Sequence, residues 1–364
     1  MEKIHILKQN NFIRGRGAQQ NTPNKFLKHI HEIQQDFLEF CRKEGEEAIQ
    51  RKTQYLAVFP KTIVNKVTSP DVGMEYSMNP YQGCEHGCIY CYARNTHEYW
   101  GLSAGLDFEQ KILVKKDTAK LLEAKLKSSK WKAATIVLSG NTDCYQPAEQ
   151  KFKITRACLE VFLRYRHPVG IITKNSLILR DMDLLRELNY HGLVGVNISI
   201  TSLSENTRRI LEPRTTTIKK RLETIAILAE NKIPVNAMLA PIIPGINSHE
   251  IINLAKASAD HGASSFAYTI VRLNGAIGLI FTDWIRKAMP DRAEKVLSLI
   301  ASCHGGTLND SRFGLRSKGE GHIAYQIQEM ARLAKLRYYK GRSFPKLNRE
   351  LHEQYKQGQW KLFT

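Results

Sequence analysis

The chain has 364 residues, of which 42% are hydrophobic and 24% charged. That is enough apolar material to bury one core of barrel size or two smaller cores. The longest apolar stretches, such as 237-AMLAPII-243, are far shorter than the roughly 20 residues of a membrane helix, and MEKIHILKQNN is not a secretory signal. We therefore expect a globular, cytoplasmic protein with no membrane partner.

The charge balance is strongly basic. Lys plus Arg number 54 and Asp plus Glu number 35, which gives a formal net charge of +19. Such a surplus is typical of surfaces that meet polyanions. Many of these charges belong to amphipathic segments such as 115–132 and 218–232, where they alternate with an apolar stripe. The net charge makes nucleic acid a candidate partner, but it does not identify the reaction that the protein catalyses.

The first 74 residues have the composition of a basic extension. The stretch 14-RGRGAQQNTPNKF-26 is predicted to be a flexible basic arm, and 29–48 is predicted to be a helix that contains Cys41. We expect the domain boundary near residue 75.

Short β-branched runs alternate with amphipathic segments from Glu75 to about residue 289. This alternation is typical of an α/β fold in which helices cover a parallel sheet or barrel. The predicted strands are 75–79, 134–139, 169–174, 194–201, 235–243 and 265–273.

Two helices between these strands carry specific expectations. The segment 149–166 is predicted to be one helix whose buried face includes Cys158. Asn247 and Glu250 suit the cap and third positions of a helix over 248–262. From residue 290 to 364 the pattern changes to helices and basic, aromatic stretches, which we interpret as an appended cap.

Three of the seven cysteines lie within eight residues, in 80-PYQGCEHGCIYCYAR-94. Cys84, Cys88 and Cys91 have C-x3-C-x2-C spacing, in the loop after the first predicted core strand. An odd, uneven set of cysteines does not favour a disulfide framework, so reduced thiols that bind metal are the better interpretation. A structural zinc site needs a fourth ligand, for which His86 is the local candidate.

A 4Fe-4S cluster is the preferred alternative. It normally takes four thiolates, so a site with three leaves one iron open to another ligand. Gly83 and Gly87 flank the first two cysteines, and they let the backbone approach the sulfur atoms closely. Cys158 and Cys303 lie outside this group and are interpreted as small hydrophobic residues.

The stretch 84-CEHGCIYC-91, with Tyr90 before its last cysteine, resembles the signature of the radical SAM superfamily. The resemblance implies a partial (β/α)6 TIM-like barrel with N- and C-terminal extensions. It also implies that S-adenosylmethionine binds the open iron and is cleaved to a 5'-deoxyadenosyl radical that abstracts hydrogen from a substrate. A reducing partner of the flavodoxin or ferredoxin type would supply the electron.

Polar residues follow the next predicted strands, where a barrel presents its functional groups. Thr142 and Asp143 could hold the ammonium end of the cofactor, or they could form an ordinary loop. Lys174 suits a carboxylate, with extension into solvent as its alternative. Ser199 ends the following strand and could contact the ribose or carboxylate.

Further segments resemble the branch that contains spore photoproduct lyase and uncharacterised lyase-like proteins. They are RGRGA at 14–18, TDCYQPAE at 142–149, EPR at 212–214 and APIIPG at 240–245. By this resemblance Tyr90, Glu212 and Arg221 join Thr142, Asp143, Lys174 and Ser199 as cofactor-binding residues, with Glu212 and Arg221 as an acidic and basic pair.

The resemblance leaves the substrate open. The lyase has a hydrogen-donating cysteine before its serine and aspartate, whereas this chain has Gly140 and Asn141 there. Cys144 is the nearest thiol and the candidate donor, with simple packing as its alternative. The substrate would be nucleic acid in a lyase-like repair reaction, a protein or a small metabolite. A non-enzymatic iron-sulfur or zinc protein is the remaining alternative.

Overall fold

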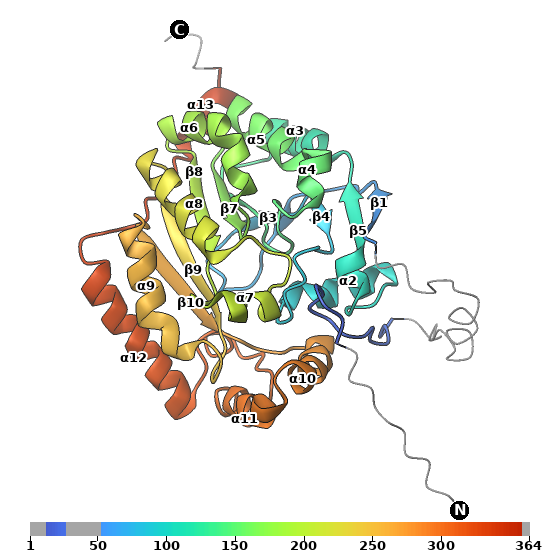
Figure 1. Ribbon diagram of the computed structural model, residues 1–364. Helices are drawn as coiled ribbons and strands as arrows, with labels where there is room; N and C mark the ends of the chain where they lie inside the picture. Colours follow the sequence, from blue (N-terminus) through green and yellow to red (C-terminus); the bar gives the residue numbers. More distant parts are fainter. Residues whose placement is uncertain (1–11, 27–51, 359–364) are drawn as a thin grey trace, which may run out of the picture.

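The computed structural model describes residues 12–26 and 52–358, and its largest element is a seven-stranded sheet with the order β10-β9-β8-β7-β6-β3-β2 (Figure 1). All six predicted strands are confirmed, and neighbouring members of this set pair in parallel; β2 is antiparallel to β3. The strands are β2 (Asn65–Lys66), β3 (Tyr76–Met78), β6 (Ile136–Leu138), β7 (Val169–Thr173), β8 (Val194–Ser199), β9 (Val235–Ile242) and β10 (Ser265–Ile270).

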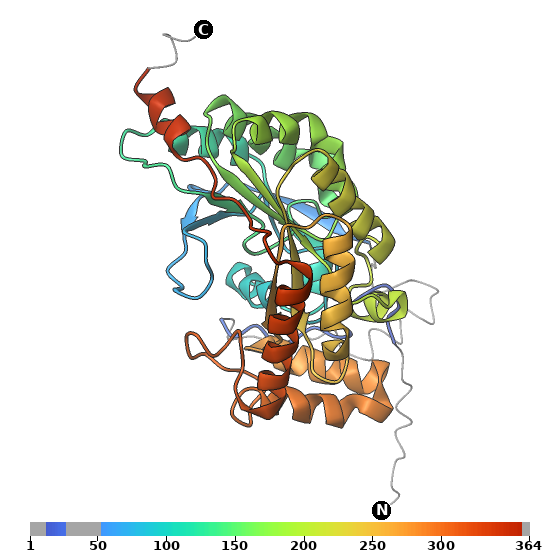
Figure 2. The same ribbon diagram turned by 90° about the vertical axis from the view of Figure 1, so that its left-hand side faces the viewer.

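Helices cover one face of this sheet, as both views show (Figures 1 and 2). Alternate strand residues such as Ile136, Ile171 and Val196 are fully buried in the main hydrophobic core, together with Leu159 and Leu254 from the helices. The apolar side chains on one face of the strands thus pack against the apolar faces of the helices. The covering helices include α3 (Thr118–Lys127), α6 (Met182–Tyr190), α8 (Ile218–Glu230) and α9 (Ile251–Asp260).

The sheet is open, as a partial barrel requires. Within the described ranges, the edge strands β10 and β2 do not pair with each other. The gap is bridged by one segment of the C-terminal third. Arg316 forms an ion pair with Asp71, between β2 and β3, and the carbonyl of Ser317 accepts a hydrogen bond of 2.8 Å from the amide of Ile270.

A second sheet of three strands was not predicted. Its order is β1-β5-β4, with β1 (Gln54–Val58) parallel to β5 (Lys111–Lys115), and β4 (Tyr81–Gln82) antiparallel to it. It is joined by η1 (Tyr92–Trp100) and α2 (Asp107–Gln110). Residues before 75 thus contribute strands to the fold. The division of the chain at residues 74 and 290 stays a prediction, and the helix expected over 29–48 with Cys41 lies outside the described residues.

The single helix predicted over 149–166 is wrong. Lys153 adopts the left-handed conformation with φ +52° and separates α4 (Ala148–Phe152) from α5 (Ile154–Arg164). The break lets the Glu149 carboxylate accept the amides of Thr155 and Arg156 at 2.9 and 3.3 Å, which caps α5. The predicted buried face of α5 is confirmed, with Cys158 fully buried.

The capping box predicted at Asn247 and Glu250 is also wrong. A short 3-10 turn, η3 (Ser248–Glu250), precedes α9, and the Asn247 side chain makes no capping hydrogen bond. Its amide donates to the carbonyls of Thr201 and Pro241 at 2.7 and 3.0 Å, and its oxygen accepts from the amide of Ile243. Asn247 therefore ties together the loops after β8 and β9.

The remaining helices are η2 (Ser176–Asp181), α7 (Glu205–Leu211), α10 (Ala276–Ala288), η4 (Pro290–Arg292), α11 (Ala293–Ser302), α12 (Gly321–Tyr338) and α13 (Glu350–Lys356). α10 and α11 share a second hydrophobic cluster with the cysteine loop, in which Trp284 and Ile280 accompany Cys88 and Ile89. Cys303 is fully buried, as predicted. None of the helices in residues 12–26 and 52–358 is both long enough and apolar enough to span a bilayer.

Candidate active site

The three clustered cysteines lie in the loop between β4 and η1. Cys84 and Cys88 are buried, Cys91 is partly buried, and all three are free thiols. Gly83 and Gly87 have φ angles of +80° and +67°, a left-handed conformation that favours glycine, so the loop can double back around the thiols.

Hydrogen bonds from distant segments hold the backbone of this loop. The amide of Cys84 donates to the carbonyl of Phe108 at 2.9 Å, and that of Ile89 donates to Leu211 at 3.0 Å. The side chain of Gln146 accepts from the amide of Glu85 and donates to the carbonyl of Gly83, both at 3.0 Å. The loop is therefore fixed by α2, α7 and the segment after β6.

The N-terminal motif RGRGA packs against the same loop. Arg94 donates to the carbonyl of Cys88 at 3.0 Å and to the Glu109 carboxylate at 2.5 Å. The same carboxylate accepts the amides of Gly17 and Ala18 at 3.1 and 2.8 Å. The flexible arm predicted for 14–26 is thus wrong at residues 16–19, which are buried, with the amides of Gly17 and Ala18 bound by Glu109.

Burial dominates the acid-base properties of the thiols. It raises the pKa of Cys84, Cys88 and Cys91 above the ordinary value, and the charge of Glu212 raises that of Cys88 further. Buried thiols of this kind become thiolates only when positive charge arrives, as it does when iron binds. The donor set fits an iron-sulfur cluster in this respect.

Asp143 lies beside the cysteine loop, in the segment after β6. Its carboxylate accepts from the hydroxyl of Thr173 and the amide of Lys174, both at 2.8 Å. His86 Nδ1 lies 3.4 Å from it, and His86 Nε2 lies 3.4 Å from the Asn175 amide. Although burial alone would raise it, the pKa of Asp143 is lowered by His86 and by the backbone amides of Lys174 and Tyr145. His86 therefore faces Asp143 and Asn175.

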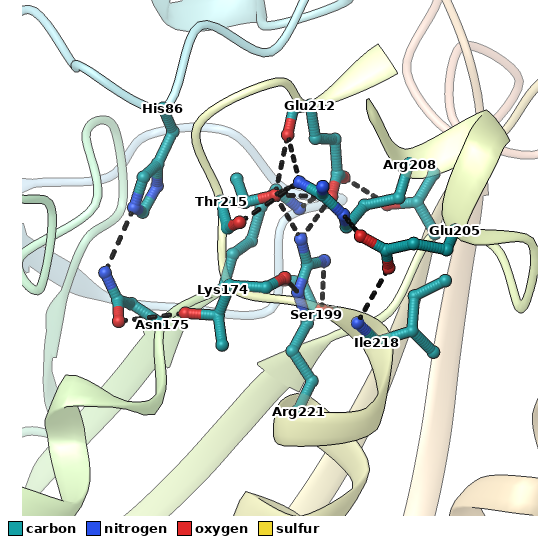
Figure 3. Close-up of polar contacts among 12 residues, drawn as sticks. His86, Lys174, Asn175, Ser199, Glu205, Arg208, Glu212, Thr215, Ile218 and Arg221 are labelled. Atoms are coloured by element: carbon teal, nitrogen blue, oxygen red, sulfur yellow. Dashed lines mark hydrogen bonds and ion pairs between the residues drawn. The ribbon is translucent and has the colours of Figure 1, made fainter. Parts of the chain in front are cut away.

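A buried polar cluster has Glu212 at its centre (Figure 3). Lys174 connects it to Asp143, because its amide donates to Asp143 and its ammonium group faces Glu212. Arg221 donates to Glu212 at 2.6 Å, Lys174 Nζ lies 3.5 Å away, and the hydroxyls of Tyr90 and Thr201 donate to the same carboxylate. Burial would raise the pKa of Glu212, but the charges of Arg221 and Lys174 hold it well below its usual range.

Most of the predicted cofactor residues thus occupy one region. Ser199 is buried at the end of β8, and its carbonyl accepts from Arg221 at 3.0 Å. Thr142 is also buried, and its hydroxyl donates to the carbonyl of Tyr81 at 2.6 Å. Arg221 and Glu212 are almost fully enclosed, so their pairing with each other is structural, whereas Lys174 retains 16% exposure of its side chain.

Cys144 follows Asp143 directly, but its side chain packs in the main hydrophobic core. It is fully buried, and its amide donates to the Ser139 hydroxyl at 2.7 Å. Burial raises the pKa of its thiol well above the ordinary value. These facts favour simple packing, and the hydrogen-donor role of Cys144 stays a prediction.

Three residues of this region were not predicted. Thr201 lies just after β8 and hydrogen-bonds Glu212, and Asn175 lies just after β7 and hydrogen-bonds His86. The strand-end rule could have found both. Tyr92 follows Cys91, remains half exposed and donates to the carbonyl of Gly140 at 2.5 Å.

The described residues contain no group of three or more His, Cys, Asp or Glu side chains that converges as the ligands of a single metal ion do. The thiols of a cluster need not converge in this way, since each of them binds a different iron.

The chain belongs to the radical SAM superfamily, whose sequence model matches residues 78–257. An uncharacterized protein of Methanocaldococcus jannaschii is 30% identical over 201 residues, which cover 55% of this chain and 72% of that protein. An uncharacterized protein of Mycobacterium tuberculosis is 29% identical over 245 residues, which cover 66% and 72%.

The fold is similar to that of spore photoproduct lyase. The structure of that enzyme complexed with dinucleoside spore photoproduct superposes with a TM-score of 0.56 at 15% identity, over 84% of this chain and 92% of the lyase. A mutant lyase with bound AdoMet and dinucleoside spore photoproduct gives the same TM-score at 14% identity. Superfamily and fold together support radical SAM catalysis.

Proposed function

We propose that this protein is a radical SAM enzyme that holds a 4Fe-4S cluster through Cys84, Cys88 and Cys91. One observation carries the proposal: three free thiols lie in the single loop after β4, close enough to Glu212 and Lys174 for those charges to act on Cys88. When bound, the cluster and S-adenosylmethionine would supply a 5'-deoxyadenosyl radical that abstracts hydrogen from the substrate.

In this proposal the protein orients the cofactor and excludes water. Lys174 offers a cation to the cofactor carboxylate, and Asp143 offers an anion to its ammonium group. Thr142 positions the loop after β6 and Ser199 positions the end of β8, on either side of Asp143 and Lys174 in the sequence. Glu212 and Arg221 act one step further away, since they hold Lys174 and Tyr90 in place.

The proposed substrate class is nucleic acid, in a lyase-like reaction. The net charge of +19 supports it, as does the likeness in fold to an enzyme solved with a dinucleoside photoproduct. A protein or a small metabolite is the alternative. The absence of a cysteine at Gly140 and Asn141 means that the hydrogen donor of a repair reaction would differ from that of the lyase, with Cys144 as the candidate.

The proposed function is tested by measuring cleavage of S-adenosylmethionine in the absence of oxygen. The protein is purified without oxygen, reconstituted with iron and sulfide, and mixed with dithionite and S-adenosylmethionine. We expect 5'-deoxyadenosine and methionine as products. Protein with a full complement of cluster that yields neither product would contradict the enzyme proposal and favour a non-enzymatic iron-sulfur protein. Zinc in place of iron in the purified protein would contradict the cluster itself.

The ligand assignment has a matched control. Cys88→Ala should abolish the brown chromophore and the cleavage of S-adenosylmethionine together. Cys158→Ala removes a fully buried thiol from α5, outside the cysteine loop, and should keep both. Retention of chromophore and turnover in Cys88→Ala would show that the ligand assignment is wrong.

The substrate class is tested by salt dependence. Each phosphate that Lys or Arg neutralises releases counterions, and this release becomes less favourable as the salt concentration rises. The affinity for an oligonucleotide should therefore fall steeply between about 50 and 200 mM salt. A flat response would count against nucleic acid and favour the protein or metabolite alternative.

A further inference from the structure

Arg272 lies just beyond the end of β10, at the same carboxyl edge of the sheet as Lys174. Burial alternates along this segment as it does in a strand, since Val271 and Leu273 are each 2% exposed whereas Arg272 is partly exposed. The two buried residues share the hydrophobic cluster of Cys88. The backbone that carries Arg272 therefore packs against the cysteine loop, and its side chain points away from that cluster.

The side chain of Arg272 lies near Tyr92, the first residue of η1. Asn95 is one 3-10 turn further along η1, on the same face as Tyr92. The Asn95 amide donates to the carbonyl of Asn274 at 2.8 Å, and its oxygen accepts from the amide of Ala276 at 3.1 Å. Asn274 is two residues after Arg272, on the same side of its segment, and Tyr92 is close enough to affect the pKa of Arg272. The start of η1 therefore faces Arg272.

Arg272 has no counter-ion within residues 12–26 and 52–358. Its Nη1 donates to the carbonyl of Asp310 at 3.2 Å, and it forms no ion pair with a described carboxylate. The two carboxylates nearby are bound by other arginines, Asp310 by Arg312 at 2.6 Å and Asp71 by Arg316. Burial and then the charge of Arg316 lower the pKa of Arg272, although Asp71 and Asp310 act in the opposite sense. A bound oxyanion would compensate this guanidinium.

Arg272 and Tyr92 flank the open side of the partial barrel. Asp310, which holds Arg272, directly precedes the segment that bridges the gap between β10 and β2. Tyr92 is 52% exposed, and its hydroxyl donates to the carbonyl of Gly140 after β6 at 2.5 Å. This hydrogen bond holds the tyrosine ring in place while one of its surfaces stays open. A substrate that reaches the cysteine loop from the open side meets both residues.

We propose that Arg272 binds a phosphate of a nucleic acid substrate and that the ring of Tyr92 stacks on the adjoining base. The inference rests on the proposed function, and it names two residues that hold the reacting nucleotide beside the cysteine loop. The planar guanidinium matches a phosphate through two parallel hydrogen bonds. An aromatic ring that is already held in place stacks on a base of any sequence.

The combination of the two side chains favours a nucleotide over the other candidate anions. A carboxylate metabolite would use the guanidinium alone and leave the ring of Tyr92 exposed. The carboxylate of S-adenosylmethionine is assigned to Lys174, which lies against Glu212 at 3.5 Å, whereas Arg272 makes no contact with that cluster in the part of the chain that the structure describes. A phosphate joined to a base uses both Arg272 and Tyr92.

The phosphate contact is tested with Arg272→Gln and Arg272→Lys in the full chain, reconstituted with iron and sulfide without oxygen. A fluorescein-labelled single-stranded oligonucleotide of about ten nucleotides is titrated by anisotropy between about 50 and 200 mM salt. In Arg272→Gln we expect affinity about tenfold weaker at low salt, and a slope of log affinity against log salt that is shallower by about 0.7, the value for one phosphate of a single strand. Arg272→Lys keeps the charge and should keep the slope.

The stacking contact is tested with Tyr92→Ala in the same titration. Loss of stacking on one base should weaken binding about tenfold and leave the salt slope unchanged, because no counterion release is lost. Iron content per chain is measured for each variant, so that an altered cluster is recognised. The matched controls are Arg337→Gln, at an exposed position on α12, and Tyr190→Ala, at the end of α6 with 84% exposure. Neither control should change affinity or slope.

An unchanged salt slope in Arg272→Gln would overturn the proposal, and so would an equal change of slope in Arg272→Lys, which would indicate a structural role. Weaker binding of S-adenosylmethionine with unchanged oligonucleotide affinity would assign Arg272 to the cofactor instead. Weaker binding of a mononucleotide alone would favour a phosphorylated metabolite and likewise contradict the proposal.

The titration requires no turnover, so it separates this contact from the radical chemistry. If the unmodified protein cleaves no S-adenosylmethionine, the proposed reaction fails, whereas a shallower slope in Arg272→Gln would still support the phosphate contact. If the unmodified protein cleaves S-adenosylmethionine but binds no oligonucleotide, the reaction stands and the phosphate contact is wrong.

Discussion

The guanidinium of Arg94 and the carboxylate of Glu109 form an ion pair of 2.5 Å in which neither side chain has any exposed surface. The pair connects two functional parts of the chain. Arg94 binds the carbonyl of Cys88, and Glu109 binds the amides of Gly17 and Ala18. A buried ion pair is weak evidence for stability, but removal of one partner leaves an uncompensated charge.

Glu109→Gln should therefore be strongly destabilising. It leaves Arg94 buried without its anion, and such changes cost about 3 to 5 kcal/mol of unfolding free energy. Urea denaturation measures the loss. The control is Glu294→Gln, which removes one partner of the exposed pair with Arg286 and should change stability by less than about 0.5 kcal/mol. Similar losses in the two variants would contradict the role assigned to Glu109.

The two glycines of the RGRGA motif should respond differently to alanine. A Cβ at Gly17 would lie 1.8 Å from the carbonyl oxygen of Gly87, so the backbone would have to move; we expect a loss of about 3 kcal/mol or more and less iron per chain after reconstitution. Gly15 has open space around it and only an unfavourable φ of +77°, which costs about 1 to 2 kcal/mol. Normal iron loading in Gly17→Ala would contradict this.

Lys174→Met should weaken the binding of S-adenosylmethionine. The lysine is the partly exposed cation of the Glu212 cluster, and loss of a charge-assisted contact costs about 1.5 to 3 kcal/mol, or at least tenfold in Kd. Equilibrium dialysis with labelled cofactor under anaerobic conditions measures the affinity. Lys219→Met, at a highly exposed position on α8, is the control. Unchanged affinity in Lys174→Met would remove this residue from the cofactor site.

The variant Cys144→Ala tests whether Cys144 donates hydrogen in the reaction or only packs in the core. Because Cys144 is fully buried in the main core, we expect a loss of about 1 kcal/mol in unfolding free energy and unchanged 5'-deoxyadenosine formation, as for Cys158→Ala. With substrate present, intact radical formation but loss of the final product in Cys144→Ala alone would establish the donor role.

Acid should destabilise the protein through its buried histidines. Burial, together with the nearby His352, lowers the pKa of His167 from 6.5 to about 3, and burial lowers that of His97 to about 4. The unfolded chain therefore binds protons below pH 6.5 that the folded protein does not bind. Each histidine should remove about 2 kcal/mol of unfolding free energy between pH 7.5 and 5.

Urea denaturation at several pH values measures this loss. His167→Gln should remove its own share of about 2 kcal/mol, whereas replacement of the exposed His322 should leave the loss unchanged. An identical pH dependence in His167→Gln would contradict the assignment.

The sequence was sufficient for the parts of the fold that repeat locally. Six strands could be located because β-branched runs recur between amphipathic helices, and Asp143, Lys174 and Ser199 could be placed because each follows such a run. The partners of Glu109 could not be predicted, since its contacts with Gly17 and Ala18 span more than 90 residues and involve backbone amides that carry no side-chain signal. The helix break at Lys153 was missed for a related reason. The Glu149 carboxylate that caps α5 is held by the hydroxyl of Tyr81, which is distant in the sequence.

The contact between Gly17 and Gly87 also constrains the order of assembly. The RGRGA segment is synthesised first, yet it can settle only after residue 109 has emerged and folded. Once it has settled, Cys84 and Cys88 are each only 7% exposed. Because Ala18 packs in the same hydrophobic cluster as Cys88, we expect iron loading to depend on how this N-terminal segment is seated, and therefore on residues that never touch the metal.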